Sequence, residues 1–287
     1  MQYFFMVAVG ATLWGFWPLF LRPAGLTGVQ NALLAMLTMA LPTPFLLRRE
    51  ALKDRRATAA LVIMGAADGI NVALYFAAVN RGPVAVAVLT HYLAPLMVAL
   101  VAPWVASERR STRALVGAPF TSLGLALLVW KPGADFSGWT ALLGSASAVL
   151  YTVSVFCAKE AARAWSPLGV TSVHSAVAVV TLLLLFGPSA LPPVQPSALW
   201  VVAGAVLCSL TGNILFNAGL RRIPAASTGA LTYMEPLTAT LVGWVFLHEA
   251  LGAMGLLGGA LVLAMGLWVA TEPRNSDSPL PSISGTS

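Results

Sequence analysis

The chain has 287 residues, of which 58% are hydrophobic and 9% are charged, whereas about 25% of the residues in a soluble domain carry charge. This composition excludes an ordinary soluble fold, because a single globular core cannot hide so much apolar surface. In a chain that is expected to lie in a bilayer, the distribution of the formal net charge of +6 matters more than its total, and we expect no nucleic-acid partner.

A helix that spans a bilayer needs roughly 20 apolar residues, and ten windows of about that length are bounded by charges, Pro or Gly. They cover residues 3–21, 29–47, 58–79, 83–106, 112–130, 138–158, 168–187, 198–219, 224–247 and 251–270. The first begins almost at Met1, without a basic leader or a cleavage pattern, so we expect an uncleaved anchor. The Ser/Pro-rich segment 271–287 is predicted to be a disordered tail.

The basic residues favour one orientation of these spans. If the N-terminus is cytoplasmic, 13 of the 16 Lys and Arg residues fall on the cytoplasmic side. These are Arg48, Arg49, Lys53, Arg55, Arg56, Arg109, Arg110, Arg113, Lys159, Arg163, Arg221, Arg222 and Arg274. The positive-inside rule therefore predicts that both termini are cytoplasmic.

Part of the chain repeats at a fixed spacing of 141 residues (236 − 95 = 141). Pro83, Tyr92, Pro95, Leu100 and Glu108 recur as Pro224, Tyr233, Pro236, Leu241 and Glu249. The first span matches the sixth more weakly at a spacing of 137, with Trp14 aligned to Tyr151. Five spans in each copy force the second copy to be inverted relative to the first.

We therefore predict an all-α membrane protein, with ten transmembrane helices as two inverted five-helix repeats around a central cavity. The first repeat is assigned to residues 1–130, the second to 131–270, and the cytoplasmic tail to 271–287. Inverted repeats are characteristic of secondary transporters, which predicts a small-molecule substrate. The alternative is a duplicated scaffold of unknown role.

At this point the segments GATLWGFWPLFLR, HYLAPLMVAL and TYMEPLTATL resemble a known group. They are similar to the EamA branch of the drug/metabolite transporter superfamily, over residues 1 to about 270. Within that branch the chain looks most like the YddG-type exporters of aromatic amino acids and methyl viologen. The resemblance implies export across a bacterial inner membrane.

Two carboxylic acids fall inside predicted spans, where an ionisable group is costly unless it faces a cavity or a partner. Asp68 lies near the middle of span 58–79, and Glu235 near the middle of span 224–247. Each is a candidate for binding substrate or a proton. The alternative is a buried carboxyl that bonds to a neighbouring helix.

Glu235 shares a helix face with Thr232 and Thr238, at the spacing that brings side chains together. The repeat places Ala94 opposite Glu235 and His91 opposite Thr232. An acid on one wall and an imidazole on the other would suit a zwitterionic or cationic solute. A lone His in an apolar helix is, however, often a structural residue.

Further polar candidates lie on two other spans. Asp68, Asn71 and Tyr75 share one face of span 58–79, and Asn213 lies in span 198–219. These side chains offer donors and acceptors to a ligand. Equally, an Asn in a membrane helix often bonds to a neighbouring helix, which contributes about 0.6 kcal/mol on average.

Aromatic side chains are predicted to wall the same cavity. The candidates are Trp14, Tyr92, Tyr151 and Tyr233, with Tyr75 beside them. Stacking and cation–π attraction hold a planar or cationic solute by about 0.5–2 kcal/mol per ring. The alternative is ordinary core or interfacial packing.

Pro95 and Pro236 fall near the middle of spans 83–106 and 224–247. Proline removes a backbone hydrogen bond and clashes with the preceding turn, so both helices should bend there. In an alternating-access protein such bends are predicted hinges, and the alternative is a static kink.

Other features predict packing rather than chemistry. Gly255 and Gly259 form a GxxxG pair, which we assign to packing within the bundle, so a monomer is expected. Cys157 and Cys208 lack the spacing of a metal or redox motif. We expect no metal and no cofactor.

Three competing functions follow from other readings of the chain. A carrier of sugar phosphates should bring Lys or Arg into the helix centres, where the predicted spans have none. A lipid flippase would be favoured by a lateral polar groove. An enzyme finds no support, because the chain lacks a zinc-protease motif, a nucleophile elbow and a phosphate-binding glycine loop.

Overall fold

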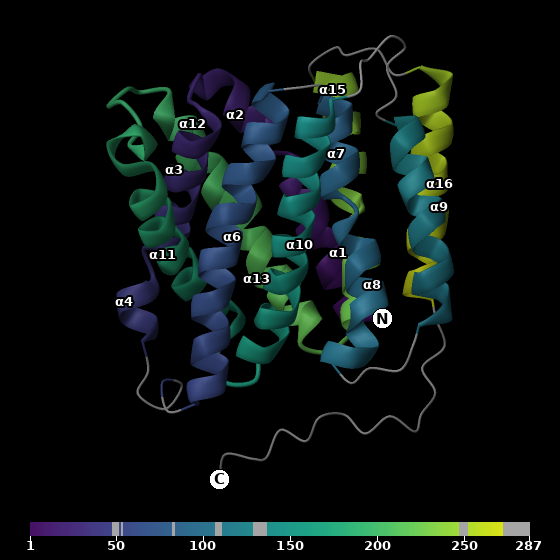
Figure 1. Ribbon diagram of the computed structural model, residues 1–287, viewed down its shortest axis with the longest axis horizontal. Coiled ribbons are helices and arrows are strands. Elements are labelled where there is room, and N and C mark those ends of the chain that lie inside the picture. The colour runs from purple at the N-terminus through teal and green to yellow at the C-terminus, as the bar shows by residue number, and fades with distance from the viewer. Residues whose placement is uncertain are drawn as a thin grey trace.

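The computed structural model describes residues 1–47, 52, 54–81, 84–106, 111–128, 137–246 and 252–271, and every regular element in these ranges is a helix. The helices run side by side, with α6, α10 and α13 near the middle of the bundle (Figure 1). Their bounds are α1 Gln2–Trp14, α2 Pro18–Ala24, α3 Gly28–Ala40, α4 Thr43–Leu46, α6 Arg55–Arg81, α7 Val84–His91, α8 Ala94–Val105, α9 Thr112–Leu128, α10 Gly138–Ala161, α11 Pro167–Phe186, α12 Ala198–Gly204, α13 Thr211–Leu220, α14 Ala225–Leu231, α15 Met234–Phe246 and α16 Ala253–Ala270. A 3-10 turn, η1 (Gly187–Ala190), follows α11, and a π-helical turn, η2 (Ala205–Leu210), joins α12 to α13.

Six stretches are long and apolar enough to cross a membrane. They are Gln2–Leu21, Arg55–Tyr75, Val86–Val105, Gly138–Ala161, Pro167–Ala190 and Ala198–Leu220, and α3, α9 and most of α16 are shorter apolar helices. The predicted all-helical membrane class is confirmed for the described residues. The exact arrangement of ten spans in two inverted halves stays a prediction. The 130/131 boundary, residues 272–287 and the repeat residues Pro83, Glu108 and Glu249 lie outside the described part.

Three of the predicted spans are broken one turn before a proline. α1 ends at Trp14 ahead of Pro18, and α7 ends at His91 ahead of Pro95. α14 and α15 are separated in the same way, ahead of Pro236. The cause is steric, because a proline ring crowds the carbonyl four residues earlier and offers no N–H to it. Each proline therefore sits in the first turn of the following helix.

Small residues let several helices of the bundle approach closely, and in two of these contacts a glycine meets a glycine. A methyl group added to Gly10 of α1 would lie 2.6 Å from the carbonyl oxygen of Gly212 on α13. A methyl group at Gly124 of α9 would likewise lie 2.9 Å from the carbonyl oxygen of Gly258 on α16. On α16, Gly259 faces Leu237 of α15, so this glycine face packs inside the bundle.

Basic residues gather at one end of the bundle. Arg56 Nε lies 2.9 Å from Glu160 Oε1, which joins the start of α6 to the end of α10. Lys159 Nζ donates to the Ile223 carbonyl at 3.0 Å, and the Arg222 guanidinium lies over an aromatic ring near the start of α1. The start of α1 and the end of α16 lie at this same end (Figure 1).

Candidate functional site

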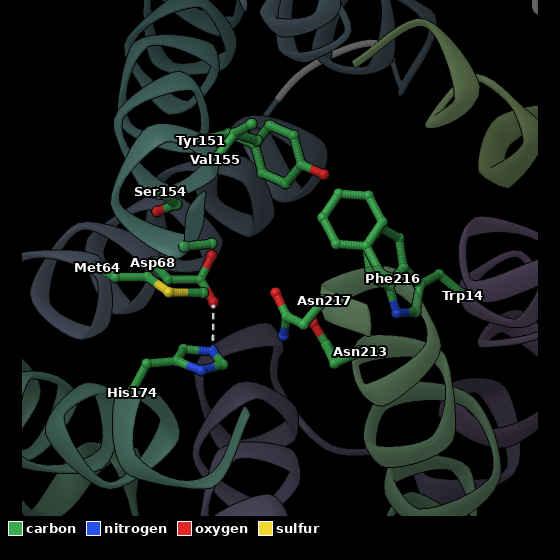
Figure 2. A pocket seen from close by; sticks show the side chains of 11 residues that line it. Trp14, Met64, Asp68, Tyr151, Ser154, Val155, His174, Asn213, Phe216 and Asn217 are labelled. Atoms are coloured by element: carbon green, nitrogen blue, oxygen red, sulfur yellow. Dashed lines mark ion pairs between the residues drawn. The ribbon is translucent and has the colours of Figure 1, made fainter. Parts of the chain in front are cut away.

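A cavity lies among α1, α6, α10, α11 and α13, in the middle of the bundle. It is lined by Trp14, Met64, Asp68, Tyr151, Ser154, Val155, Ala158, His174, Asn213, Phe216 and Asn217 (Figure 2). Its volume of about 40 Å³ holds a few water molecules, since one water needs roughly 10–15 Å³. The site must therefore widen before it can take an aromatic solute.

The charged wall of the cavity is made by Asp68 of α6 and His174 of α11. His174 Nε2 lies 3.5 Å from Asp68 Oδ2, the pair marked by a dashed line in Figure 2. Asp68 is the acid among the residues that line the cavity, and no Lys or Arg is among them. A solute that enters this space therefore meets a site whose fixed charge is negative or, with a protonated His174, neutral.

A chain of hydrogen bonds leads from Asp68 to His91 at the end of α7. Asn71 Nδ2 donates to Asp68 Oδ1 at 3.2 Å, and the Ser147 hydroxyl donates to Asn71 Oδ1 at 2.7 Å. Ser147 Oγ also lies 2.7 Å from His91 Nδ1. Because the one hydroxyl proton of Ser147 is directed at Asn71, His91 Nδ1 must be the donor in that contact.

Three tyrosines surround the His91 ring. The ring centroids of Tyr75, Tyr92 and Tyr151 lie 4.4, 5.1 and 5.8 Å from that of His91. The two closest come from α6 and from the α7–α8 break, and the third comes from α10. Because Tyr151 also lines the cavity, this aromatic cluster is continuous with the space beside Asp68.

Glu235 joins the aromatic cluster through Tyr92. Its carboxylate accepts a hydrogen bond from the Tyr92 hydroxyl and interacts electrostatically with the hydroxyls of Tyr75 and Tyr151. The residue lies in the first turn of α15, where the positive end of the helix dipole favours a carboxylate. Glu235 is not among the residues that line the cavity, but it and Asp68 both interact electrostatically with Tyr151.

Three buried polar atoms of cavity residues have no hydrogen-bond partner among the described residues. They are Trp14 Nε1, Ser154 Oγ and Asn217 Oδ1. A buried polar group without a partner costs about 1–3 kcal/mol, so such atoms call for an occupant. Together they offer an indole donor, a hydroxyl and a carbonyl acceptor around one small space.

The other predicted site residues fall into two groups. Asn213 lines the cavity, and its Nδ2 donates to the Ser209 carbonyl at 2.8 Å. Tyr233 lies apart from the cavity, because its buried hydroxyl contacts the Tyr92 carbonyl and Ser122 Oγ, each at 3.0 Å. The structure thus brings Asp68, Trp14, Tyr151 and Asn213 to the cavity, and His91, Tyr75, Tyr92 and Glu235 to the cluster beside it. Asn71 bridges the two.

His174 was missed at the level of sequence. It lies in the apolar segment 168–187, where any ionisable residue is a functional candidate, so that rule alone could have found it. The internal repeat gave no help, because a spacing of 137 aligns His174 with Leu37. Among the described residues, no cluster of three or more His, Cys, Asp or Glu side chains is placed to hold a metal ion.

Known proteins resemble this chain over most of its length. The sequence model of the EamA-like transporter family matches residues 1–130 and 138–271. An uncharacterized transporter of Archaeoglobus fulgidus is 30% identical over 77% of this chain and 78% of its own length. An uncharacterized transporter of Pseudomonas aeruginosa is 27% identical over 93% of this chain and 90% of its own.

The fold has a counterpart among solved structures. One crystal structure superimposes with a TM-score of 0.76 at 24% identity, covering 92% of this chain and 95% of the other. That likeness concerns the fold alone, whereas the family match covers nearly the whole described helical bundle and the relatives are named as transporters. The chain therefore belongs to the EamA-like transporter family and is a multi-pass membrane transporter.

Proposed function

We propose that the protein exports a small amino-acid-like or aromatic cationic solute across a bacterial inner membrane by alternating access. The observation that carries this proposal is the cavity beside Asp68. One wall supplies a carboxylate for a cationic group, and another supplies the rings of Trp14, Phe216 and Tyr151 for an apolar or aromatic part. The Trp14 and Phe216 rings already pair at a centroid distance of 4.9 Å.

The proposed architecture is two inverted five-helix halves that meet at this cavity. The two breaks support it, because residues 84–91 of α7 and residues 225–231 of α14 stand at the repeat spacing of 141 and each precedes a proline. The two segments matched by the family, residues 1–130 and 138–271, support the same division. We place the basic end, with Arg56 and Lys159, on the cytoplasmic side.

The rival functions find less support in the site. A sugar-phosphate carrier needs cationic side chains, and the residues that line the cavity include none of Lys or Arg. A flippase needs a polar groove open to lipid. The lateral groove of about 460 Å³ between α8 and α10 is instead almost wholly apolar. It is lined by Met97, Val101, Val105, Val149, Thr152, Val153, Phe156 and Cys157.

A substrate panel in proteoliposomes tests the proposal. The purified protein is reconstituted, and counterflow of each labelled solute against its own unlabelled pool is measured in turn for L-phenylalanine, L-alanine, methyl viologen and glucose 6-phosphate. We expect aromatic amino acids or methyl viologen to exchange and glucose 6-phosphate not to. Exchange of the sugar phosphate alone would overturn the assignment.

A variant of the ring wall sharpens the same test. In Trp14→Ala we expect the half-saturating concentration of the aromatic solute to rise about tenfold, because a lost ring contact is worth roughly 0.5–2 kcal/mol. Trp139 is an exposed residue of α10 outside the cavity, so Trp139→Ala serves as the matched control and should leave that concentration within about twofold. Equal effects of the two variants would remove Trp14 from the binding site.

A further inference from the structure

The contacts of the buried His174 determine which of its two ring nitrogens carries a proton in the neutral state. Its Nδ1 lies 2.8 Å from the Val170 carbonyl oxygen, one turn earlier in α11. A carbonyl can only accept, so Nδ1 carries a proton. In the neutral ring the lone pair is then on Nε2, the atom that lies 3.5 Å from Asp68 Oδ2.

An ionised carboxylate also only accepts. If both groups were deprotonated, a lone pair of His174 would face a lone pair of Asp68 at a buried position, with no proton between them. One proton resolves the conflict, either as an imidazolium beside a carboxylate or as a carboxylic acid that donates to the imidazole. A cationic group of a bound solute would resolve it in the same way.

We propose that Asp68 and His174 form a one-proton site that a cationic solute and a proton occupy in turn, which couples transport to the proton gradient. This inference rests on the proposed function and adds its source of energy. The remaining oxygen of the acid, Asp68 Oδ1, is held by Asn71, so the oxygen that faces His174 is also the one left for the solute.

The neighbouring helices offer few other groups that could take this proton. Among the described residues, α3, α4 and α13 carry no ionisable side chain, and their sequences consist of apolar, amide and hydroxyl residues. The helices that do carry such groups are α6, α7 and α10. Besides Asp68, the ionisable residues of these helices are Arg55, Arg56, Tyr75, Arg81, His91, Tyr151, Cys157, Lys159 and Glu160.

Most of these groups are accounted for by other contacts. Glu160 pairs with Arg56, and Lys159 donates to a backbone carbonyl at the basic end. His91 donates its Nδ1 proton to the Ser147 hydroxyl oxygen. Tyr151 lines the cavity, with its ring against that of His91. Glu235 is a further acid near Tyr151, but it is not among the residues that line the cavity. The Asp68–His174 pair is thus where a single added proton changes the charge at the cavity wall.

One proton and one solute cation cross in opposite directions in each cycle. With the cavity open to the outside, the solute leaves and one proton from that side binds between Asp68 Oδ2 and His174 Nε2. With the cavity open to the cytoplasm, a solute cation binds at Asp68 and the proton returns to cytoplasmic water. One proton therefore enters for each solute exported. At equilibrium, a gradient of one pH unit would support about a tenfold accumulation of a monovalent cation.

The test separates exchange from coupling in proteoliposomes. L-phenylalanine and methyl viologen are used as probes, once in counterflow without a gradient and once with an imposed pH gradient and an internal pH-sensitive dye. Wild type is expected to accumulate solute against its gradient and to move protons in the opposite direction. In His174→Gln, whose amide N–H can donate to Asp68 without binding a proton, we expect slower counterflow that persists and accumulation that falls to the level of equilibration.

Ser175→Ala is the matched control, since Ser175 neighbours His174 on α11 and, within the described part of the chain, its hydroxyl bonds only to the Thr171 carbonyl of its own helix. It should accumulate solute as wild type does. Accumulation by His174→Gln equal to that of wild type would overturn the proton site. Counterflow in wild type without any accumulation or proton movement would overturn it too, while leaving the transport function intact.

A measurement without solute tests the proton site even if the protein exchanges none of the solutes in the panel. Infrared difference spectra of the purified protein are recorded across a pH titration for wild type, Asp68→Asn and His174→Gln. We expect carboxyl and imidazole bands to titrate together in wild type and the joint step to vanish in both variants. If the two groups titrate independently in wild type, the shared-proton site is wrong, even if no solute of the panel is exchanged.

Discussion

The breaks between α7 and α8 and between α14 and α15 have the same backbone arrangement, but their polar side chains differ. Each ends one helix a turn before a proline and carries a tyrosine, Tyr92 or Tyr233, at the break. In the first break His91 bonds across to Ser147 of α10. In the second the equivalent Thr232 bonds back to the Gly229 carbonyl of its own helix.

The surroundings of the two breaks also differ. All seven residues of α14 are buried, whereas most described side chains of α7 are only partly buried. The acid lies on the second break, since Glu235 takes the position that Ala94 holds in the first. The comparison of the two breaks shows that the proline determines where each helix ends. The polar side chains around the proline can differ, so that one break carries the imidazole and the other carries the acid.

The largest effect is expected from removing the acid of the second break. Glu235→Gln keeps the shape of the side chain and removes the charge that Tyr92 contacts. The initial rate of counterflow should fall about thirtyfold or more, which corresponds to roughly 2 kcal/mol for the loss of one partner of a buried charged contact. Thr240→Val on the same helix is the control, because its hydroxyl bonds to the Pro236 carbonyl and to no other residue that the structure describes. Wild-type rates in Glu235→Gln would place the acid outside the transport pathway.

Next in size is the effect of filling in the breaks themselves. Pro95→Ala and Pro236→Ala each restore an N–H and remove the ring that crowds the preceding turn. If the breaks are hinges, both variants should slow counterflow by about tenfold, or roughly 1.4 kcal/mol. Thermal unfolding of the detergent-solubilised variants reports whether the fold is kept. Rates within about twofold of wild type in both variants would assign the prolines to static bends.

A smaller effect is expected at the imidazole of the first break. His91→Leu leaves Ser147 without its donor and interrupts the chain that leads to Asp68, which should slow counterflow about fivefold, or roughly 1 kcal/mol for one buried hydrogen bond. His91→Asn restores an N–H close to the position of Nδ1 and should recover most of the rate. Equal rates in the two variants would mean that the hydrogen bond has no part in transport.

The smallest expected effects separate the two tyrosines. Tyr92→Phe removes the donor to Glu235 and should slow counterflow about threefold. Tyr233→Phe removes contacts to Ser122 and the Tyr92 carbonyl and should lower the free energy of unfolding by about 1 kcal/mol. SDS titration measures the stability of each variant, and counterflow measures its rate. A larger transport defect in Tyr233→Phe than in Tyr92→Phe would reverse the assignment of the two roles.

Much of the helical pattern could be predicted, because a bilayer imposes both the length and the apolar character of its helices. Asp68 and Glu235 could be found for the same reason, as charges where the sequence is otherwise apolar. The break after Trp14 was not predicted, although Pro18 signals it. The π-helical turn at Ala205–Leu210 could not be, since it depends on how its helix packs against others.

The site was harder to predict than the helices, because its contacts join residues far apart in the chain. Asn71 and Ser147 are separated by 76 positions, and neither local sequence predicts the hydrogen bond between them. The repeat helped only where both copies kept a polar or aromatic residue, as at Tyr92 and Tyr233. His174 has no such counterpart, so the repeat could not identify it.

The contact of Gly10 with Gly212 carries a mechanical consequence for the proposed exchange of conformations. It joins a helix of the first proposed half to a helix of the second with no side chain between their backbones, and side chains are the parts that usually yield when helices slide. Two backbones in direct contact leave little room for sliding, so this contact would act as a pivot. Rotation about this point would narrow the bundle at one end by the same movement that widens it at the other.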